Sequence, residues 1–92
     1  MRCDWDPAKD VLNQLKHGLT LADGIPALED PQRESWIDDR FDYGEERVIT
    51  LGLTQAGVLY VVTIELDEDL TRIISVRRAE SHEVQRYDQS RT

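Results

Sequence analysis

The sequence predicts a small α/β domain of the α+β type, with an antiparallel sheet of three to four strands. Three β-rich segments separated by short polar turns, at 47–54, 58–66 and 70–78, predict the sheet. Apolar residues at helical spacing near both ends predict two helices before the sheet and one after it. The 92 residues leave room for a single domain, residues 1–92.

The first helix is predicted at 7–17, after a short strand at 3–5. Asp6 suits the N-cap, and proline is favoured at the first helical position, which Pro7 occupies. Gly18 can end the helix in a left-handed conformation. The apolar residues of this helix recur at helical spacing: Ala8, Val11, Leu12 and Leu15.

The next segment predicts a short or kinked second helix. Thr20 and Asp23 form a pair like a capping box, which opens the helix. Gly24 and Pro26 weaken it, so we expect it to end near Leu28. Three further elements lead into the sheet: a turn at 30–31, a strand at 34–37 and an acidic loop at 38–46.

Turn residues define the hairpins of the predicted sheet. Gln55-Ala56-Gly57 suits a three-residue loop with Gly57 at a positive φ, and Asp67-Glu68-Asp69 suits a second turn. Residues 80–89 predict the closing helix, with Val84 and Tyr87 on one face.

Alternation along the strands predicts one apolar face, which receives the helices, and one mixed face, which carries the function. The apolar face holds Val48, Thr50, Tyr60, Val62, Ile64, Ile74 and Val76. The mixed face holds Arg47, Ile49, Leu51, Val61, Thr63, Glu65, Ser75 and Arg77. In this register Arg47 lies opposite Glu65 and near the opposite end of the sheet from Arg77. A slip of one residue would exchange the faces.

The charge balance limits the possible functions. The chain has 19 acidic and 11 basic residues and a net charge of −8 at pH 7. Nucleic acid repels such a protein at long range, which counts against a DNA-coating role, although a local Arg and Lys cluster can still hold a few phosphates. The absence of a signal region and of a membrane-length apolar run predicts a cytoplasmic protein. Two histidines and one cysteine lack the spacing of a metal site, so we expect none.

Two segments near the ends of the chain carry a resemblance to a known family. They are Trp5-Asp6-Pro7-Ala8-Lys9 with Asn13 and Lys16-His17-Gly18, and Arg72-Ile73-Ile74-Ser75-Val76-Arg77-Arg78-Ala79 with Glu83 and Tyr87. In order and spacing they resemble the BrnT family of toxins from bacterial type II toxin–antitoxin pairs. The fold of that family is similar to that of RelE-type ribonucleases. The interrupted second helix departs from the plainer helix of family members.

The resemblance implies an endoribonuclease toxin that inhibits translation and is neutralised by a BrnA-type antitoxin. It implies metal-independent cleavage with no cofactor, and no direct DNA binding by this chain, because the antitoxin carries that part. Such cleavage needs a base for the 2′-hydroxyl, cations for the phosphorane and an acid for the leaving oxygen. The resemblance implies catalytic roles for Lys9, His17, Arg47, Arg72, Arg77 and Tyr87, and RNA contacts for Asn13, Lys16 and Arg78.

Structural roles compete with these assignments. Lys9, Asn13 and Lys16 share one helix face, which suits a solvated surface as well as RNA. His17 equally suits bonding to the last helix carbonyls, and Arg47 suits a cross-strand ion pair. The alternative function is a non-catalytic interaction module, a decayed toxin that only binds a partner and keeps its arginines as ion pairs.

Overall fold

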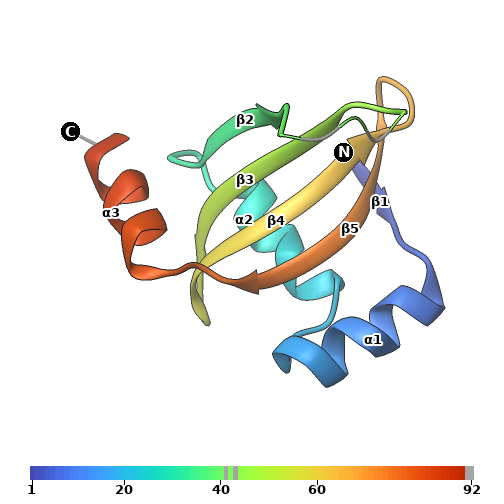
Figure 1. Cartoon of the computed structure of the whole chain (residues 1–92), viewed down its shortest axis with the longest axis horizontal. Coiled ribbons are helices and arrows are strands. Elements are labelled where there is room, and N and C mark those ends of the chain that lie inside the picture. Colours follow the sequence, from blue (N-terminus) through green and yellow to red (C-terminus); the bar gives the residue numbers. More distant parts are fainter. Residues whose placement is uncertain (41, 43, 91–92) are drawn as a thin grey trace.

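The computed structural model describes residues 1–40, 42 and 44–90, and these form one five-stranded mixed sheet flanked by helices (Figure 1). The strand order is β1-β5-β4-β3-β2. The strands are β1 (Arg2–Asp4), β2 (Glu34–Asp38), β3 (Arg47–Thr54), β4 (Gly57–Glu65) and β5 (Leu70–Arg78). The helices are α1 (Pro7–His17), the 3₁₀ turn η1 (Ala22–Gly24), α2 (Ile25–Glu29) and α3 (Ser81–Ser90). No helix in these described ranges is long and apolar enough to cross a membrane.

The predicted α+β class is confirmed, but the predicted sheet of three to four antiparallel strands is wrong. β1 adds a parallel edge, with Arg2 opposite Leu70 and Asp4 opposite Arg72. At the other edge β2 pairs antiparallel with β3. A three-residue strand has no usable periodicity, and its partner lies nearly seventy residues further along the chain. Local pattern therefore could not reveal this pairing.

The register of the β3–β4 hairpin differs by one residue from the prediction. Thr54 pairs with Gly57, so the turn has two residues, and Gly57 begins β4 with the expected positive φ of 98°. Val48 consequently pairs with Thr63. Arg47 then lies opposite Ile64, and the predicted pairing of Arg47 with Glu65 is wrong.

This shift changes which side chains share a face of the sheet. Ile49 and Leu51 lie on the same side as Tyr60, and the three form a buried cluster with Tyr87 of α3. On the opposite side, a larger cluster joins the strands to the segment from Leu19 to α2. Its buried members are Leu19, Leu21, Ala27, Leu59, Val61, Ile73 and Val76. The helices therefore cover both faces, not mainly one: α2 lies behind the sheet in Figure 1, and α3 lies at the end near β3.

The caps of α1 form as the sequence predicts. The Asp6 side chain accepts a hydrogen bond from the Ala8 amide at 2.9 Å. Gly18 ends the helix with φ of 70°, and its amide donates to the carbonyl of Gln14. All residues of α1 are described, and among them Asn13 alone is buried. The helix therefore turns a polar side toward the rest of the protein.

The side chain of Asn13 fastens α1 to the edge of β5. Its Nδ2 donates to the carbonyls of Leu19 at 2.8 Å and Val76 at 2.9 Å. Its Oδ1 accepts from the Val76 amide at 3.1 Å. Because β1 pairs only with residues 70–72, the amide of Asn13 takes the place of a neighbouring strand further along β5.

We predict that Asn13→Ala lowers the free energy of unfolding by about 2–4 kcal/mol, because it leaves buried backbone groups without partners. Gln14→Ala is the matched control, since the side chain of this exposed neighbour donates one hydrogen bond, to Asp10 within the same helix. Urea unfolding of the two variants and the wild type measures the difference. Equal stability of the two variants would contradict the structural role.

Candidate functional site

A groove between α1 and β5 brings together several of the residues that the resemblance implicates. The groove has a volume of about 190 Å³ and is called here the α1/β5 groove. Its lining residues are Lys9, Leu12, Asn13, Lys16, His17, Ile74 and Ser75. Lys9 and Lys16 are seven residues apart, two helical turns along one side of α1. Two ammonium groups therefore flank a floor supplied by β5.

A bulge in β5 shapes that floor. Val62 pairs with Ser75, but the next residue of β4, Thr63, pairs with Ile73, which leaves Ile74 as the extra residue. A bulge bends a strand and changes the direction of its side chains, and bulges are frequent beside functional sites. Here it places both Ile74 and Ser75 at the groove.

Arg77 does not line the groove, but it is a fixed cation close enough to His17 for its charge to act on the imidazole. Its Nη1 and Nη2 donate to the two carboxylate oxygens of Glu83 at 2.7 and 2.9 Å. Its guanidinium lies 3.8 Å from the ring centre of Tyr60, and Nη1 also donates to the carbonyl of Arg78. This half-buried fork is held in one orientation, which is the arrangement that positions a cation for phosphate.

The pair also fixes the charge states. Burial opposes ionisation of Glu83, but hydrogen bonds from Arg77 and from the Glu80 amide outweigh it, and the pKa of Glu83 lies below its ordinary value. The bond to Glu83 raises the pKa of Arg77, which burial alone would lower. Both groups therefore stay charged at neutral pH. The negative partner offsets part of the positive field of Arg77.

His17 occupies the last position of α1. Partial burial, together with the positive charges of Lys16 and Arg77, lowers the pKa of its imidazole. The ring is therefore mostly neutral at pH 7 and is able to accept a proton. Arg78 reaches the same end of the helix, where its Nη1 donates to the His17 carbonyl at 3.4 Å. The structure thus gathers Lys16, His17, Arg77 and Arg78 at one end of β5.

Arg72 and Arg47 lie at the other end of the sheet. Ile64 pairs with Arg72 and lies opposite Arg47, so the three stand in one row. Arg72 is bonded to both carboxylate oxygens of Asp4, at 3.0 and 3.1 Å, which ties β5 to β1. Hydrogen bonding within this exposed pair lowers the pKa of Asp4 and raises that of Arg72.

The two ends are too far apart for one phosphate. Arg77 pairs with Tyr60, which pairs with Leu51, so Arg77 is four residues and two strands from Arg47. This corresponds to about 13 Å along the strands and about 10 Å across them. A single scissile phosphate at the α1/β5 groove does not contact Arg47 directly.

Two predicted site residues face the interior instead. Tyr87 is 1% exposed, and its hydroxyl donates to the carboxylate of Asp30 at 2.5 Å. Asn13 uses both amide hydrogens on carbonyls of the protein itself. Neither side chain presents its polar group to a ligand in this geometry.

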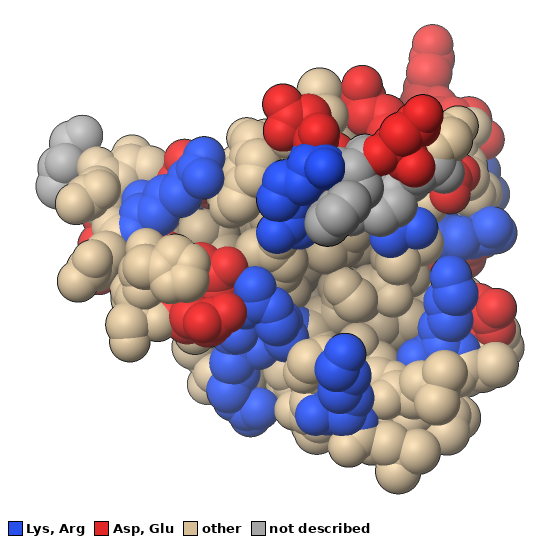
Figure 2. Space-filling view, in the orientation of Figure 1, with Lys and Arg blue, Asp and Glu red and all other residues tan. Residues whose placement is uncertain are grey.

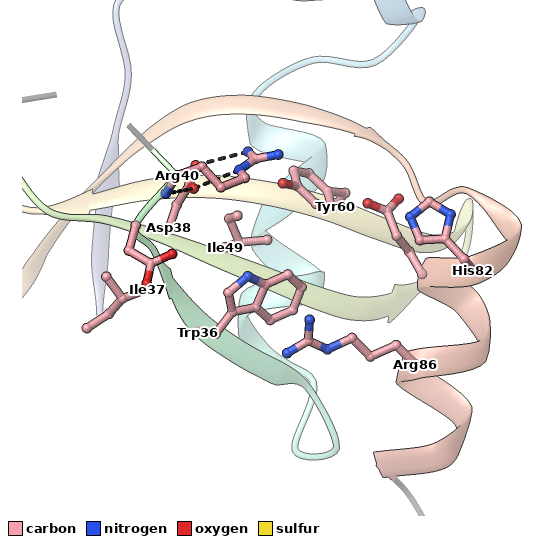
Figure 3. A pocket seen from close by; sticks show the side chains of 10 residues that line it. Trp36, Ile37, Asp38, Arg40, Ile49, Tyr60, His82 and Arg86 are labelled. Atoms are coloured by element: carbon pink, nitrogen blue, oxygen red, sulfur yellow. Dashed lines mark hydrogen bonds and ion pairs between the residues drawn. The ribbon is translucent and has the colours of Figure 1, made fainter. Parts of the chain in front are cut away.

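A second hollow, of about 180 Å³, lies between β2 and the start of α3 (Figure 3). Aromatic and charged side chains line it, including Trp36, Tyr60, His82 and Arg86. Arg86 points at Trp36 in the figure, with its guanidinium 3.7 Å from the ring centre. Arg77 covers Tyr60 in the same way. One face of each ring is therefore already occupied by a cation, which leaves less room for base stacking.

Charge is distributed unevenly over the surface. Figure 2 shows Lys and Arg side chains around an uncharged centre on the face in view, while most visible Asp and Glu side chains gather at its upper edge. A local cationic site thus coexists with a net charge of −8. Among the described residues, no three His, Cys, Asp or Glu side chains are grouped closely enough to hold a metal ion.

Sequence reasoning missed Tyr60 and the apolar part of the groove. Tyr60 is the cross-strand partner of Arg77, a relation that only the correct β4–β5 register reveals. Leu12 is one of the apolar residues that recur at helical spacing along α1, yet it is 64% exposed and lines the groove. The polar residues on the opposite side of α1 are the sequence signal that the apolar side faces outward.

Comparisons with known proteins agree with the fold and with the resemblance. The crystal structure of the Brucella abortus ribonuclease toxin BrnT is similar in fold, with a TM-score of 0.63 and 23% sequence identity over 88% of this chain and 99% of that chain. At this identity the likeness supports the fold alone. No curated protein matches the chain significantly in sequence. A family model described as "Ribonuclease toxin, BrnT, of type II toxin-antitoxin system" matches residues 5–83. The chain therefore belongs to the BrnT family of ribonuclease toxins of type II toxin–antitoxin systems.

Proposed function

We propose that this chain is an endoribonuclease that inhibits translation, cleaves RNA at the α1/β5 groove without a metal, and is neutralised by a BrnA-type antitoxin. One observation carries the proposal: Lys9, Lys16 and His17 line a single groove, and Arg77 is fixed beside it. A base with a lowered pKa next to several cations is the combination that 2′-hydroxyl attack on phosphorus requires.

In the proposed reaction, His17 takes the proton of the 2′-hydroxyl. The 2′-oxygen then bonds to phosphorus, and the bond to the 5′-oxygen breaks, which leaves a 2′,3′-cyclic phosphate. Arg77 and Lys16 stabilise the charge of the phosphorane, and the Lys16 ammonium supplies the proton for the 5′-oxygen. Lys9, two turns away on α1, holds a neighbouring phosphate. Arg78 holds the RNA backbone on the other side of His17.

Arg47 and Arg72 have a different role in this proposal. Their row lies too far from His17 to contact the same phosphate, so they bind the RNA backbone beyond the cleavage point. The pairing of Arg72 with Asp4 also makes it part of the sheet edge. Tyr87 supports α3 from the interior and takes no part in the chemistry.

The second candidate function is a non-catalytic module that only binds a partner. The carboxylate pairs of Arg77 and Arg72 favour it, because each guanidinium already has an internal counter-ion. The two candidates differ in whether Lys9, Lys16 and His17 act on RNA.

Purified protein should cleave a single-stranded RNA oligonucleotide in the presence of EDTA and yield a 2′,3′-cyclic phosphate end. The same oligonucleotide with 2′-deoxyribose at the cleaved position is the control, and it should remain intact because it lacks the nucleophile. Gel analysis and mass spectrometry of the fragments measure both outcomes. Intact RNA with folded protein would favour the binding module.

Arg77→Ala should reduce the cleavage rate roughly a hundredfold, because removal of one preorganised cation weakens the binding of the transition state. Arg72→Ala is the matched control, since it removes another carboxylate-paired arginine of β5 at the far end, and it should cost less than about tenfold by the same reasoning. Circular dichroism checks that both variants fold, and Arg77→Lys keeps a cation where the alanine variant unfolds. Equal losses in the two variants would contradict the assignment.

The cleavage rate should depend on pH through His17. Because a base must be unprotonated and the pKa of His17 is lowered, the rate should reach half of its plateau below pH 6.5, the ordinary value. His17→Ala should lose this titration together with most of the activity. A pH–rate profile between about pH 4.5 and 8 measures it, and a titration that persists in His17→Ala would assign the base elsewhere.

A further inference from the structure

The outer side of α1 is apolar and exposed. Val11 is 56% exposed, Leu12 64% and Leu15 80%. These three residues, called here the apolar stripe, lie within about one helical turn and share one face, because residues three and four apart are neighbours on a helix. The opposite side of α1 holds Asn13 and Asp10, whose carboxylate accepts the Leu21 amide at 2.8 Å. The orientation of α1 is therefore the reverse of an ordinary surface helix, which buries its apolar side and exposes its polar side.

The stripe is not needed for the core of this chain. Leu19, Leu21 and Ala27 already complete the cluster over the sheet, and Leu21 and Ala27 are fully buried. Polar contacts through Asn13 hold α1 in place. A contiguous apolar patch with no packing role is a typical mark of a protein–protein contact.

The stripe continues directly into the α1/β5 groove. Leu12 lines the groove together with Lys9 and Lys16, which stand one turn before and one turn after it on the helix. An occupant of this surface thus meets apolar side chains on one side and two ammonium groups on the other. The matching chemistry is a segment that carries apolar and acidic residues together.

We propose that the antitoxin covers this surface with an amphipathic segment whose apolar residues pack on Val11, Leu12 and Leu15 and whose carboxylates pair with Lys9 and Lys16. The inference rests on the proposed function, because it assigns the antitoxin to the groove in which RNA is cleaved. Occupation of the groove by carboxylates excludes phosphates from the same lysines. Neutralisation is then direct occlusion.

The acidic turn after β4 is less suited to the main contact. Asp67 accepts the backbone amides of Asp69 and Leu70, and Asp69 pairs with Arg2 at 3.0 Å. Two of its three carboxylates thus already have partners within the chain. The apolar stripe and the neighbouring lysines combine apolar and positively charged side chains, whereas this turn is acidic.

A second copy of this chain is a poorer occupant. A symmetric contact would place the same patch on both sides, so Lys9 and Lys16 of one copy would approach the same lysines of the other. Like charges placed together oppose association. The charge pattern therefore favours an acidic partner.

The test uses Val11→Gln/Leu15→Gln, which removes the outer part of the stripe and leaves the groove residues in place. Glutamine is a good helix former, so α1 should persist. Leu53→Gln/Leu66→Gln is the matched control, because these leucines are 49% and 42% exposed on other surfaces. The probe is the purified protein encoded by the open reading frame adjacent to this gene, titrated by calorimetry.

We expect the Kd of the stripe variant to rise at least about tenfold, and that of the control to change less than about twofold, because only the stripe loses buried apolar area. RNA cleavage by the free protein should be unchanged in both variants. An unchanged Kd in the stripe variant, or no binding of the probe by the wild type, overturns the proposal.

Sedimentation velocity tests whether a second copy of this chain, instead of the antitoxin, occupies the surface. A wild-type dimer that the stripe variant converts to monomer, with no change in probe affinity, assigns the surface to a second copy and overturns the proposal. Failure of the proposed function gives a different result: RNA stays intact while the probe binds in a stripe-dependent manner. The two proposals therefore fail separately.

Discussion

The amide of Asn13 is the contact on which the arrangement of the site depends. It joins α1 to β5 across 63 residues of sequence and satisfies both backbone groups of Val76. Because the apolar side of α1 faces outward, hydrophobic packing contributes little to holding this helix, and directed hydrogen bonds carry the task. Hydrogen bonds fix orientation more sharply than apolar packing does. Lys9, Lys16 and His17 are consequently presented to β5 in one geometry.

The arginine pair with Glu83 has opposing consequences for the site. It fixes the guanidinium of Arg77 next to Tyr60, so little rotamer freedom would remain to be lost in the proposed binding of a phosphate. The pair also weakens the positive field of Arg77, because the negative carboxylate of Glu83 lies 2.7 Å from the guanidinium. The net charge of the whole chain matters less than this local geometry, since charges further apart than about 8 Å are largely screened at physiological salt.

The sequence predicts the bounds of several helices and strands well, but it predicts poorly how the strands pair and what each face contacts. The bounds of α1, β3 and β5 agree with the structure because each is set locally, by Asp6 and Gly18 for the helix and by turn residues for the strands. The predicted β3–β4 register is wrong because it counts Gly57 as part of the loop, whereas the positive φ of this glycine is equally compatible with the first position of β4. Among the site residues, spacing placed Asn13 on the same side of the helix as Lys9 and Lys16. It could not show that Asn13 is buried and the lysines are exposed, because periodicity identifies a face and does not say what the face contacts.

In the proposed complex, the apolar stripe gives the antitoxin a contact that RNA does not make. In the proposed function, RNA binds the lysines of the groove through its phosphates, and that attraction would weaken as salt rises because counterions compete for the charges. A protein segment on the proposed surface competes for the same lysines, but it also buries Val11, Leu12 and Leu15, and apolar burial is not screened by salt. The difference in affinity between the two occupants then comes mainly from the stripe. A helix α1 whose apolar side faces outward is therefore consistent with the proposed competition, in which the antitoxin displaces RNA from the groove at physiological salt. Asn13 holds the helix in place without its exposed leucines.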